Sequence, residues 1–207
     1  MRKRRSRLQT SRRLLWIAAG AIIVVALVAG LERWISGIGP QPGAAQAIGG
    51  PFSLIDQEGR RVTDREFRGK WMLVYFGYTR CPDACPTTLN EVAGALEKLG
   101  PLADRLQPLF ITVDPARDTA AELTSYTKAF DTRILGLTGS PAEIAQAATA
   151  YRITFARHEM PQVSDYAMDH TSVLTLLDAS GRFVIRFGDQ IGQDRLAEKL
   201  RAFLEKG

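Results

Sequence analysis

Hydrophobic residues are distributed along this chain in two ways. Near the N-terminus they form one unbroken run, because residues 14–31 contain no charged side chain and ten of these 18 residues are Leu, Ile or Val. A helix of this length spans about 27 Å at about 1.5 Å per residue, close to the roughly 30 Å hydrocarbon core of a bilayer. The run therefore predicts one transmembrane helix.

From residue 51 onward, short apolar runs alternate with segments of helical periodicity. The predicted strands are the apolar runs at residues 52–55, 61–63, 71–76, 108–113, 173–177 and 183–187, of which the first two form an N-terminal hairpin. The predicted helices are the segments at residues 87–99, 119–130, 141–150 and 193–204, two of which open with a capping box. This order predicts an α/β sandwich with a mixed central sheet.

The charges flanking the transmembrane run predict its orientation. Residues 1–13 contain seven Arg and Lys and no acidic residue, and a basic flank stays in the cytoplasm. We expect a single-pass protein of the inner (cytoplasmic) membrane, with its remaining part in the periplasm. The alternative is a cleaved signal peptide, because residues 45–47 resemble a cleavage site and residues 11–14 a twin-arginine signal. Either interpretation exports the rest of the chain.

The formal net charge of +5 comes from the basic flank. Without its seven basic residues, 20 of the 27 Lys and Arg remain against 22 Asp and Glu, so nucleic-acid binding is not expected. Residues 36–50 are uncharged and rich in Gly, Ala and Pro. This composition predicts a flexible linker over residues 32–50 and a folded domain over residues 51–207.

The only two cysteines, Cys81 and Cys85, follow the predicted strand at 71–76. Two such thiols can form a disulfide, bind a soft metal ion or exchange electrons with another thiol protein, and their place before a helix is typical of a thioredoxin-like arrangement. Pro82 and Pro86 disfavour helix at the residues before them, which predicts a loop with Pro86 at the first helical position. A purely structural disulfide is disfavoured, because closing so short a loop contributes only about 2 kcal/mol.

A metal site needs a third ligand, and the chain has two histidines. His170 lies just before the predicted strand at 173–177, at an end of the sheet, whereas His158 lies in a polar stretch that indicates an exposed loop. Two thiolates and one imidazole suit Cu(I), with zinc and a water molecule as the chemical rival. Met160 and Met168 are soft donors nearby, but packing is the commoner role of a methionine.

Three stretches of the sequence together resemble a known family: GKWMLVYFGYTRCPDACPTTL, VDPARDT at 113–119 and DHTS at 169–172. They are similar to the Sco (SenC) family of membrane-tethered copper proteins. These proteins have a thioredoxin-like fold and assist assembly of the dinuclear copper centre of cytochrome c oxidase. The resemblance implies that Cys81, Cys85 and His170 bind copper, as Cu(I) or Cu(II).

From this resemblance we expect a copper metallochaperone that delivers copper to subunit II of cytochrome c oxidase. Other periplasmic copper carriers or thiol-disulfide proteins are the further partners that it implies. The resemblance also implies that the cysteines act as a dithiol–disulfide pair. The alternative is therefore a thiol-disulfide oxidoreductase that keeps the oxidase cysteines reduced, and a peroxidase is a weaker third hypothesis.

Three aspartates lie in or beside these motifs. Asp169 is a candidate to orient the His170 imidazole, although neighbouring residues of a strand point to opposite faces. Asp114 and Asp118 are expected to be loop and cap residues without a chemical role.

Overall fold

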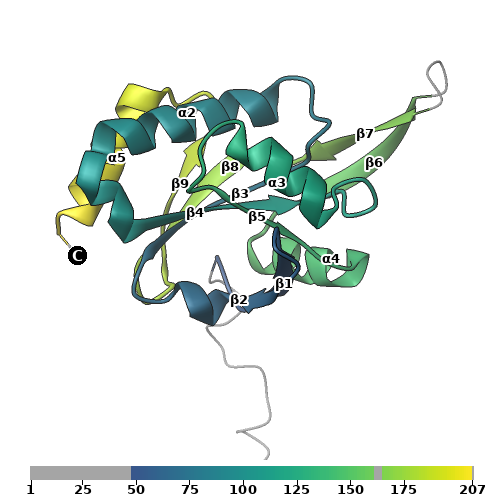
Figure 1. Ribbon diagram of the computed structural model, residues 1–207, viewed down its shortest axis with the longest axis horizontal. Coiled ribbons are helices and arrows are strands. Elements are labelled where there is room, and N and C mark those ends of the chain that lie inside the picture. The colour runs from purple at the N-terminus through teal and green to yellow at the C-terminus, as the bar shows by residue number, and fades with distance from the viewer. Residues whose placement is uncertain (1–47, 161–164, 207) are drawn as a thin grey trace, which may run out of the picture. The chain divides into compact units, whose positions relative to one another are not determined.

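The computed structural model describes residues 48–160 and 165–206 (Figure 1). The basic flank, the transmembrane run and nearly all of the linker predicted from the sequence lie outside these residues. Within them, no helix is both long enough and apolar enough to cross a membrane.

A mixed sheet of seven strands forms the centre of the domain, in the order β2-β1-β5-β4-β3-β8-β9. The strands are β1 (Ser53–Asp56), β2 (Arg61–Thr63), β3 (Trp71–Gly77), β4 (Leu106–Thr112), β5 (Leu135–Thr138), β8 (Val173–Leu177) and β9 (Phe183–Gly188). Strands β3, β4 and β5 run parallel to one another, and the other neighbours pair antiparallel. Strand β3 is buried at every position, because it lies between two strands and beneath helices.

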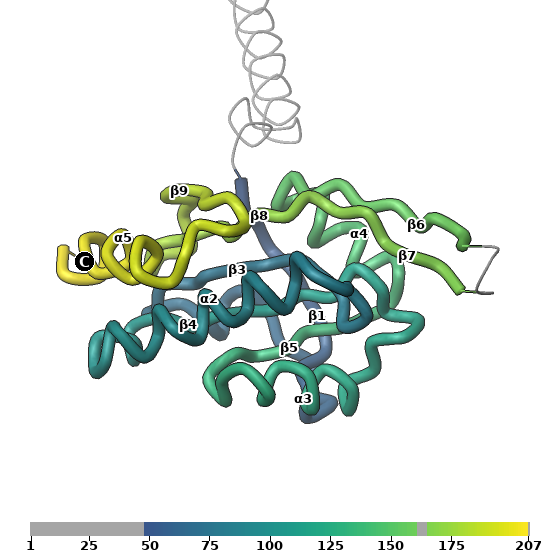
Figure 2. The backbone as a smooth tube through the Cα atoms, turned by 90° about the horizontal axis from the view of Figure 1, so that it is seen from above, coloured from purple at the N-terminus to yellow at the C-terminus, as the bar shows by residue number. Residues whose placement is uncertain are grey.

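Four α-helices cover the sheet. They are α2 (Ala84–Leu99), α3 (Ala120–Lys128), α4 (Pro141–Ala150) and α5 (Gln193–Leu204), with short 3₁₀ helices η1 (Asp64–Phe67) and η2 (Gly100–Arg105). Helices α2 and α3 both cross between parallel neighbours in the same direction, so right-handed crossovers place them on one face. Helix α5 packs against α2 on that face, and α4 lies on the other (Figures 1 and 2).

The prediction of a thioredoxin-like sandwich with a mixed sheet is confirmed by this arrangement of β3, α2, β4, α4, β8, β9 and α5. Helices α4 and α5 have the predicted bounds, and the capping boxes at Thr119 and Ser140 both form. The N-terminal hairpin also forms. Because β1 pairs with β5 as well as with β2, this hairpin extends the central sheet at its edge.

Three strands of the structure were not predicted. Strand β5 has only four residues, and β6 (Phe155–Met160) and β7 (Asp165–His170) are too polar to give an apolar pattern. Strands β6 and β7 pair with each other in a separate two-stranded sheet, which extends past the end of the central sheet (Figures 1 and 2). The prediction that His158 lies in a loop is therefore wrong, although its side chain is exposed as expected.

The packing of α5 provides a test of the core. Leu200 is fully buried in this helix. We expect Leu200→Ala to lower the free energy of unfolding by about 2–5 kcal/mol, because the smaller side chain leaves a cavity. Urea denaturation followed by circular dichroism measures the change. The matched control is Glu198→Ala on the exposed side of the helix, expected to change stability by no more than about 0.5 kcal/mol, and equal losses in both variants would contradict the assignment.

Candidate metal centre

Cys81 lies in the loop after β3, and Cys85 lies in the first turn of α2. The helix begins at Ala84, so Cys85 is its second residue and Pro86 its third. The prediction that Pro86 occupies the first helical position is therefore wrong by two residues. The first amides of a helix have no partner within it, so a residue without an N–H is tolerated anywhere in this turn.

The start of α2 places the sulfur of Cys81 against the helix N-terminus. The side chain of Asp83, the residue before the helix, makes no capping hydrogen bond, and the amide of Cys85 donates to Cys81 Sγ at 3.3 Å. The Cys81 sulfur therefore accepts a bond that a capping oxygen usually accepts. The positive end of the helix dipole favours a thiolate at this position.

The two thiols differ in acidity because they differ in surroundings. A hydrogen bond from the Cys85 thiol, with further bonds from His170 and from backbone amides, lowers the pKa of Cys81 to about 4. Donating that same bond raises the pKa of Cys85, and burial raises it further. Cys81 is half-buried, Cys85 has no exposed surface, and both are free thiols. The pair thus combines an accessible thiolate with a protected thiol.

His170 ends β7 and faces the cysteines. Its Nε2 lies 3.4 Å from Cys85 Sγ, and its Nδ1 lies 3.3 Å from the carbonyl oxygen of Thr171. When a metal ion binds in place of the hydrogen bond to Cys81, a proton on Nδ1 that is donated to this carbonyl would leave the Nε2 lone pair to the ion. The rings of Tyr75 and Tyr78 meet the imidazole nearly edge-on, with centroids 6.1 and 6.0 Å away.

The side chains of Cys81, Cys85 and His170 form one group of donors. The two sulfurs and one imidazole nitrogen lie within 4.8 Å of one another. A metal ion with bonds of about 2.0 to 2.3 Å needs its donors within about 4.6 Å, so small side-chain adjustments suffice. Two thiolates and one imidazole are soft donors, and soft donors of this kind select Cu(I) or zinc.

Asp169, Met160 and Met168, which the sequence also suggested near the site, do not join this group of donors. Asp169 points to the outer face of β7, where it pairs with His158 Nε2 at 2.7 Å, so the suggested role of orienting His170 is wrong. The acceptor for the imidazole is the Thr171 carbonyl instead. Met160 is exposed, whereas Met168 is buried and packs in the core, as expected of a methionine.

Two residues of β3 support Cys85 and were not singled out from the sequence. The buried hydroxyl of Tyr75 lies 3.8 Å from Cys85 Sγ and 2.9 Å from the hydroxyl of Ser172. Gly77 allows the sulfur to approach the strand closely, because a β-carbon on Gly77 would lie 2.9 Å from Cys85 Sγ. An apolar run predicts burial for both positions, but it carries no signal for contact with a particular sulfur.

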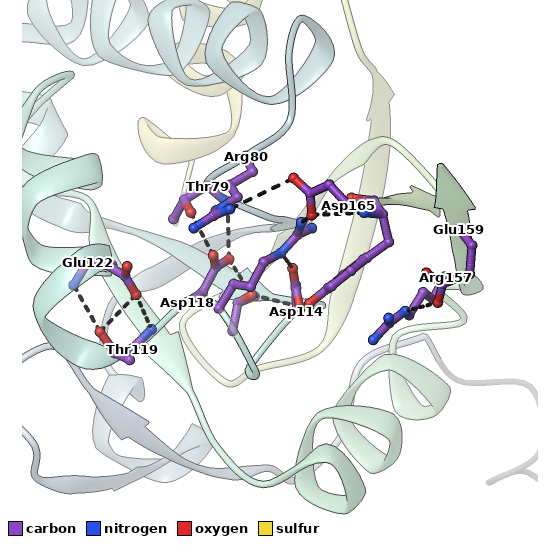
Figure 3. A network of polar contacts seen from close by, with 12 residues as sticks. Thr79, Arg80, Asp114, Asp118, Thr119, Glu122, Arg157, Glu159 and Asp165 are labelled. Atoms are coloured by element: carbon purple, nitrogen blue, oxygen red, sulfur yellow. Dashed lines mark hydrogen bonds and ion pairs between the residues drawn. The ribbon is translucent and has the colours of Figure 1, made fainter. Parts of the chain in front are cut away.

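The sequence also did not reveal that Asp118 supports the cysteine loop. Its carboxylate is fully buried and accepts the amide and hydroxyl of Thr79 at 3.0 and 2.6 Å, and the hydroxyl of Thr112 at 2.6 Å (Figure 3). Burial raises the pKa of Asp118. Thr119, and not Asp118, caps α3. Asp118 therefore fixes the backbone two residues before Cys81. It lies in a loop as expected, but the expectation that it caps a helix is wrong.

The fold and the donor group define a class: thioredoxin-like α/β proteins with a soft-metal centre at the start of the first sandwich helix. The family model described as SCO1/SenC matches residues 40–205. The chain belongs to the SCO1/SenC family.

Curated relatives in this family include mitochondrial proteins. The chain is 43% identical over 161 residues to Protein SCO1 homolog 1, mitochondrial, of Arabidopsis thaliana, which covers 77% of this chain and 48% of the relative. It is 38% identical over 156 residues to Protein SCO1 homolog, mitochondrial, of Homo sapiens, covering 74% of this chain and 52% of the relative. The chain thus spans about half the length of these two relatives.

Two solved structures match this chain over nearly their whole length. The structure of Bradyrhizobium japonicum ScoI with copper bound has a TM-score of 0.71 and 44% identity, and the match covers 76% of this chain and 99% of that one. The crystal structure of Arabidopsis thaliana ScoI with copper bound has a TM-score of 0.73 and 40% identity, and the match covers 78% and 100%. Both matches support the thioredoxin-like fold.

The unequal thiols predict unequal reactivity in the reduced, metal-free protein. We expect iodoacetamide to modify Cys81 before Cys85. The Cys81 rate should hardly change between about pH 6 and about pH 8, because a pKa of about 4 leaves it ionised throughout. A thiol with a pKa of about 8.5 would gain about 75-fold over this range. Mass spectrometry of the alkylated peptides measures both rates.

The control for this experiment is Cys85→Ser. It replaces the thiol that donates to Cys81 with a weaker acid of similar size, so any change in the pH profile of Cys81 reports on this bond. A steep rise of the wild-type Cys81 rate between about pH 6 and about pH 8 would show that the thiolate is not stabilised.

Proposed function

We propose that this protein is a copper metallochaperone in which Cys81, Cys85 and His170 bind one copper ion. The observation that carries the proposal is the convergence of two free thiols and one imidazole within 4.8 Å. The relatives whose structures contain copper support it, because they share the fold and more than a third of their residues with this chain.

Copper fits this donor set better than zinc. Among the residues that the structure describes, the group has three His, Cys, Asp or Glu donors, whereas zinc usually takes four ligands. Three soft donors satisfy Cu(I), which accepts low coordination numbers. Cys81 and His170 are only partly buried, so a donor from another protein has access to the ion. These properties suit an ion that is carried and then passed on.

The expected client is subunit II of cytochrome c oxidase, with its dinuclear copper centre. The similarity of the chain to the Sco family supports this partner. The apolar run at residues 14–31 would tether the domain to the inner membrane, on the periplasmic side where the client's copper domain is expected. Other periplasmic copper carriers would supply the ion.

Thiol-disulfide exchange is the second candidate function, and the lowered pKa of Cys81 favours it. The Cys81 thiolate would attack a disulfide of the partner and displace one of its sulfurs as a thiolate. Cys85, after losing its proton, would then attack the mixed disulfide. The products are a Cys81–Cys85 disulfide and a partner whose two cysteines are reduced. This reaction needs no histidine ligand.

A copper titration tests the proposal. The reduced domain is expected to bind one Cu(I) per chain in competition with a chelator, and His170→Ala should weaken binding by at least about 10-fold, because it removes a donor and not only a supporting contact. Cys81→Ser and Cys85→Ser should weaken it further. His158→Ala on the neighbouring strand is the matched control and should leave the affinity unchanged. Undiminished binding by His170→Ala would contradict the site.

A cellular experiment separates the two functions. The copper content of the oxidase is measured in a strain that lacks this protein and carries wild type or His170→Ala. A metallochaperone loses function in this variant, whereas an oxidoreductase keeps it as long as the thiol redox potential of the variant is unchanged.

A further inference from the structure

The three proposed ligands come from two separate parts of the fold. Cys81 and Cys85 lie at the junction of β3 and α2, within the central sandwich. His170 lies on β7, whose only strand partner in the described chain is β6. A two-stranded sheet is marginally stable unless it packs on something else. The position of His170 relative to the cysteines therefore depends on the two-residue connection to β8 and on the contacts that hold β7 against the sandwich.

One face of β7 supplies these contacts. Alternate residues of a strand share a face, so Tyr166, Met168 and His170 point to the same side. The hydroxyl of Tyr166 donates to Asp114 Oδ1 at 2.7 Å, Met168 is buried in the core, and His170 meets Cys85. Tyr166 is the anchor farthest from the metal centre, and it lies beside Asp165 where β7 begins.

Arg117 connects this anchor to the sandwich. Its Nη1 donates to Asp165 Oδ1 at 2.9 Å and to the carbonyl oxygen of Tyr166 at 3.0 Å, and its Nε donates to Asp114 Oδ2. Its guanidinium carbon lies 3.5 Å from the centroid of the Tyr166 ring. That of Arg157 lies 3.8 Å from the same centroid, so the ring is held between two guanidinium groups.

Burial separates the roles of the two arginines. The Arg117 side chain is 11% exposed and the Asp114 side chain 4%, whereas the Arg157 side chain is 54% exposed and forms its ion pair with Glu159 of its own strand. An ion pair that is buried and supported by further hydrogen bonds is specific in geometry, and an exposed one contributes little. Arg117 is therefore the more deeply buried of the two arginines that contact β7, and it joins this strand to the loop after β4.

The same loop also fixes the cysteine side of the centre. The amide of Asp114 donates to the hydroxyl of Thr112, and this hydroxyl donates to Asp118. Asp118 in turn accepts hydrogen bonds from the amide and hydroxyl of Thr79, two residues before Cys81 (Figure 3). Arg80 Nη1 lies 3.9 Å from Asp165 Oδ2, so this ion pair joins the cysteine loop directly to the start of β7.

We propose that Arg117 is a positioning residue of the metal centre, which keeps His170 within reach of the two cysteines by holding β7 against the loop at residues 113–119. The inference rests on the proposed function, because it concerns the same three ligands. It assigns a role to the VDPARDT stretch that lies between the cysteine and histidine motifs in the sequence.

The experiment compares Cu(I) affinities in a double-mutant cycle. Arg117→Ala is expected to weaken binding by about 10-fold, the lower end of the loss typical of residues that orient a metal ligand. In the His170→Ala background the same change should cause no further loss, because the ligand that Arg117 positions is already absent. An equal loss in both backgrounds would mean that Arg117 supports the fold or the cysteines instead, and it would overturn the proposal.

Two further readouts respond to positioning alone. X-ray absorption at the copper edge should show two sulfur donors in Arg117→Ala with weakened imidazole scattering, as in His170→Ala. In the metal-free protein, amide hydrogen exchange should become faster in β6 and β7 and stay unchanged in β3. Unchanged imidazole scattering, or unchanged exchange in β6 and β7, would count against the proposal.

Milder variants guard against unfolding. Tyr166→Phe keeps the stacked ring and removes only the hydroxyl bond to Asp114, so a smaller loss in the same direction is expected. Arg117→Lys, which keeps the charge but not the planar fork, should restore affinity only in part. The matched control is Arg133→Ala, which removes an arginine whose ion pair is with Asp131. A loss in Arg133→Ala as large as that in Arg117→Ala would refute a specific role.

Each outcome also distinguishes this proposal from the proposed function. Wild-type protein that binds no copper would refute the metallochaperone, while hydrogen exchange in the metal-free variants would still decide whether Arg117 holds β7. Wild-type binding that depends on His170 but not on Arg117 would refute the positioning role alone.

Discussion

The buried hydrogen bonds of Asp118 connect the loop that carries Cys81 to the central sheet, and the arrangement of the donor group depends on this connection. A fully buried carboxylate is costly unless donors surround it, and here two threonine hydroxyls and one amide supply them. One of the hydroxyls and the amide belong to Thr79, at the beginning of the cysteine loop. The other belongs to Thr112 at the end of β4. Asp118 thus ties the loop that carries Cys81 to the end of β4.

The N-terminus of α2 sets the chemical environment of this loop. It offers an unpaired amide and a partial positive charge just where the loop ends, and the Cys81 sulfur receives both. The sulfur of Cys85, in the first turn of the helix, is buried beside the Tyr75 hydroxyl and the backbone of Gly77. Cys81 and Cys85, four positions apart, therefore differ in acidity and in exposure, because the first is a partly exposed thiolate and the second a buried thiol.

The sequence was sufficient for the features that depend on local patterns. Continuous apolar runs predicted β3 and β4, and the capping boxes predicted the starts of α3 and α4, because both signals act within a few residues. The strands β6 and β7 were missed because they are too polar to give an apolar pattern, and the contacts of β7 with Arg117 and Asp114 span about 50 residues of the chain. The hydrogen bonds of Asp118 were missed for a similar reason, since its partner Thr79 precedes it by 39 residues.

The unequal burial of the two cysteines has a kinetic consequence for any ion bound between them. Cys85 offers no surface to an approaching molecule, whereas Cys81 and His170 are partly exposed. A donor atom from another protein would reach such an ion from the side of Cys81 and His170. Ligand replacement would then proceed in sequence, with the bond to Cys85 exchanged last.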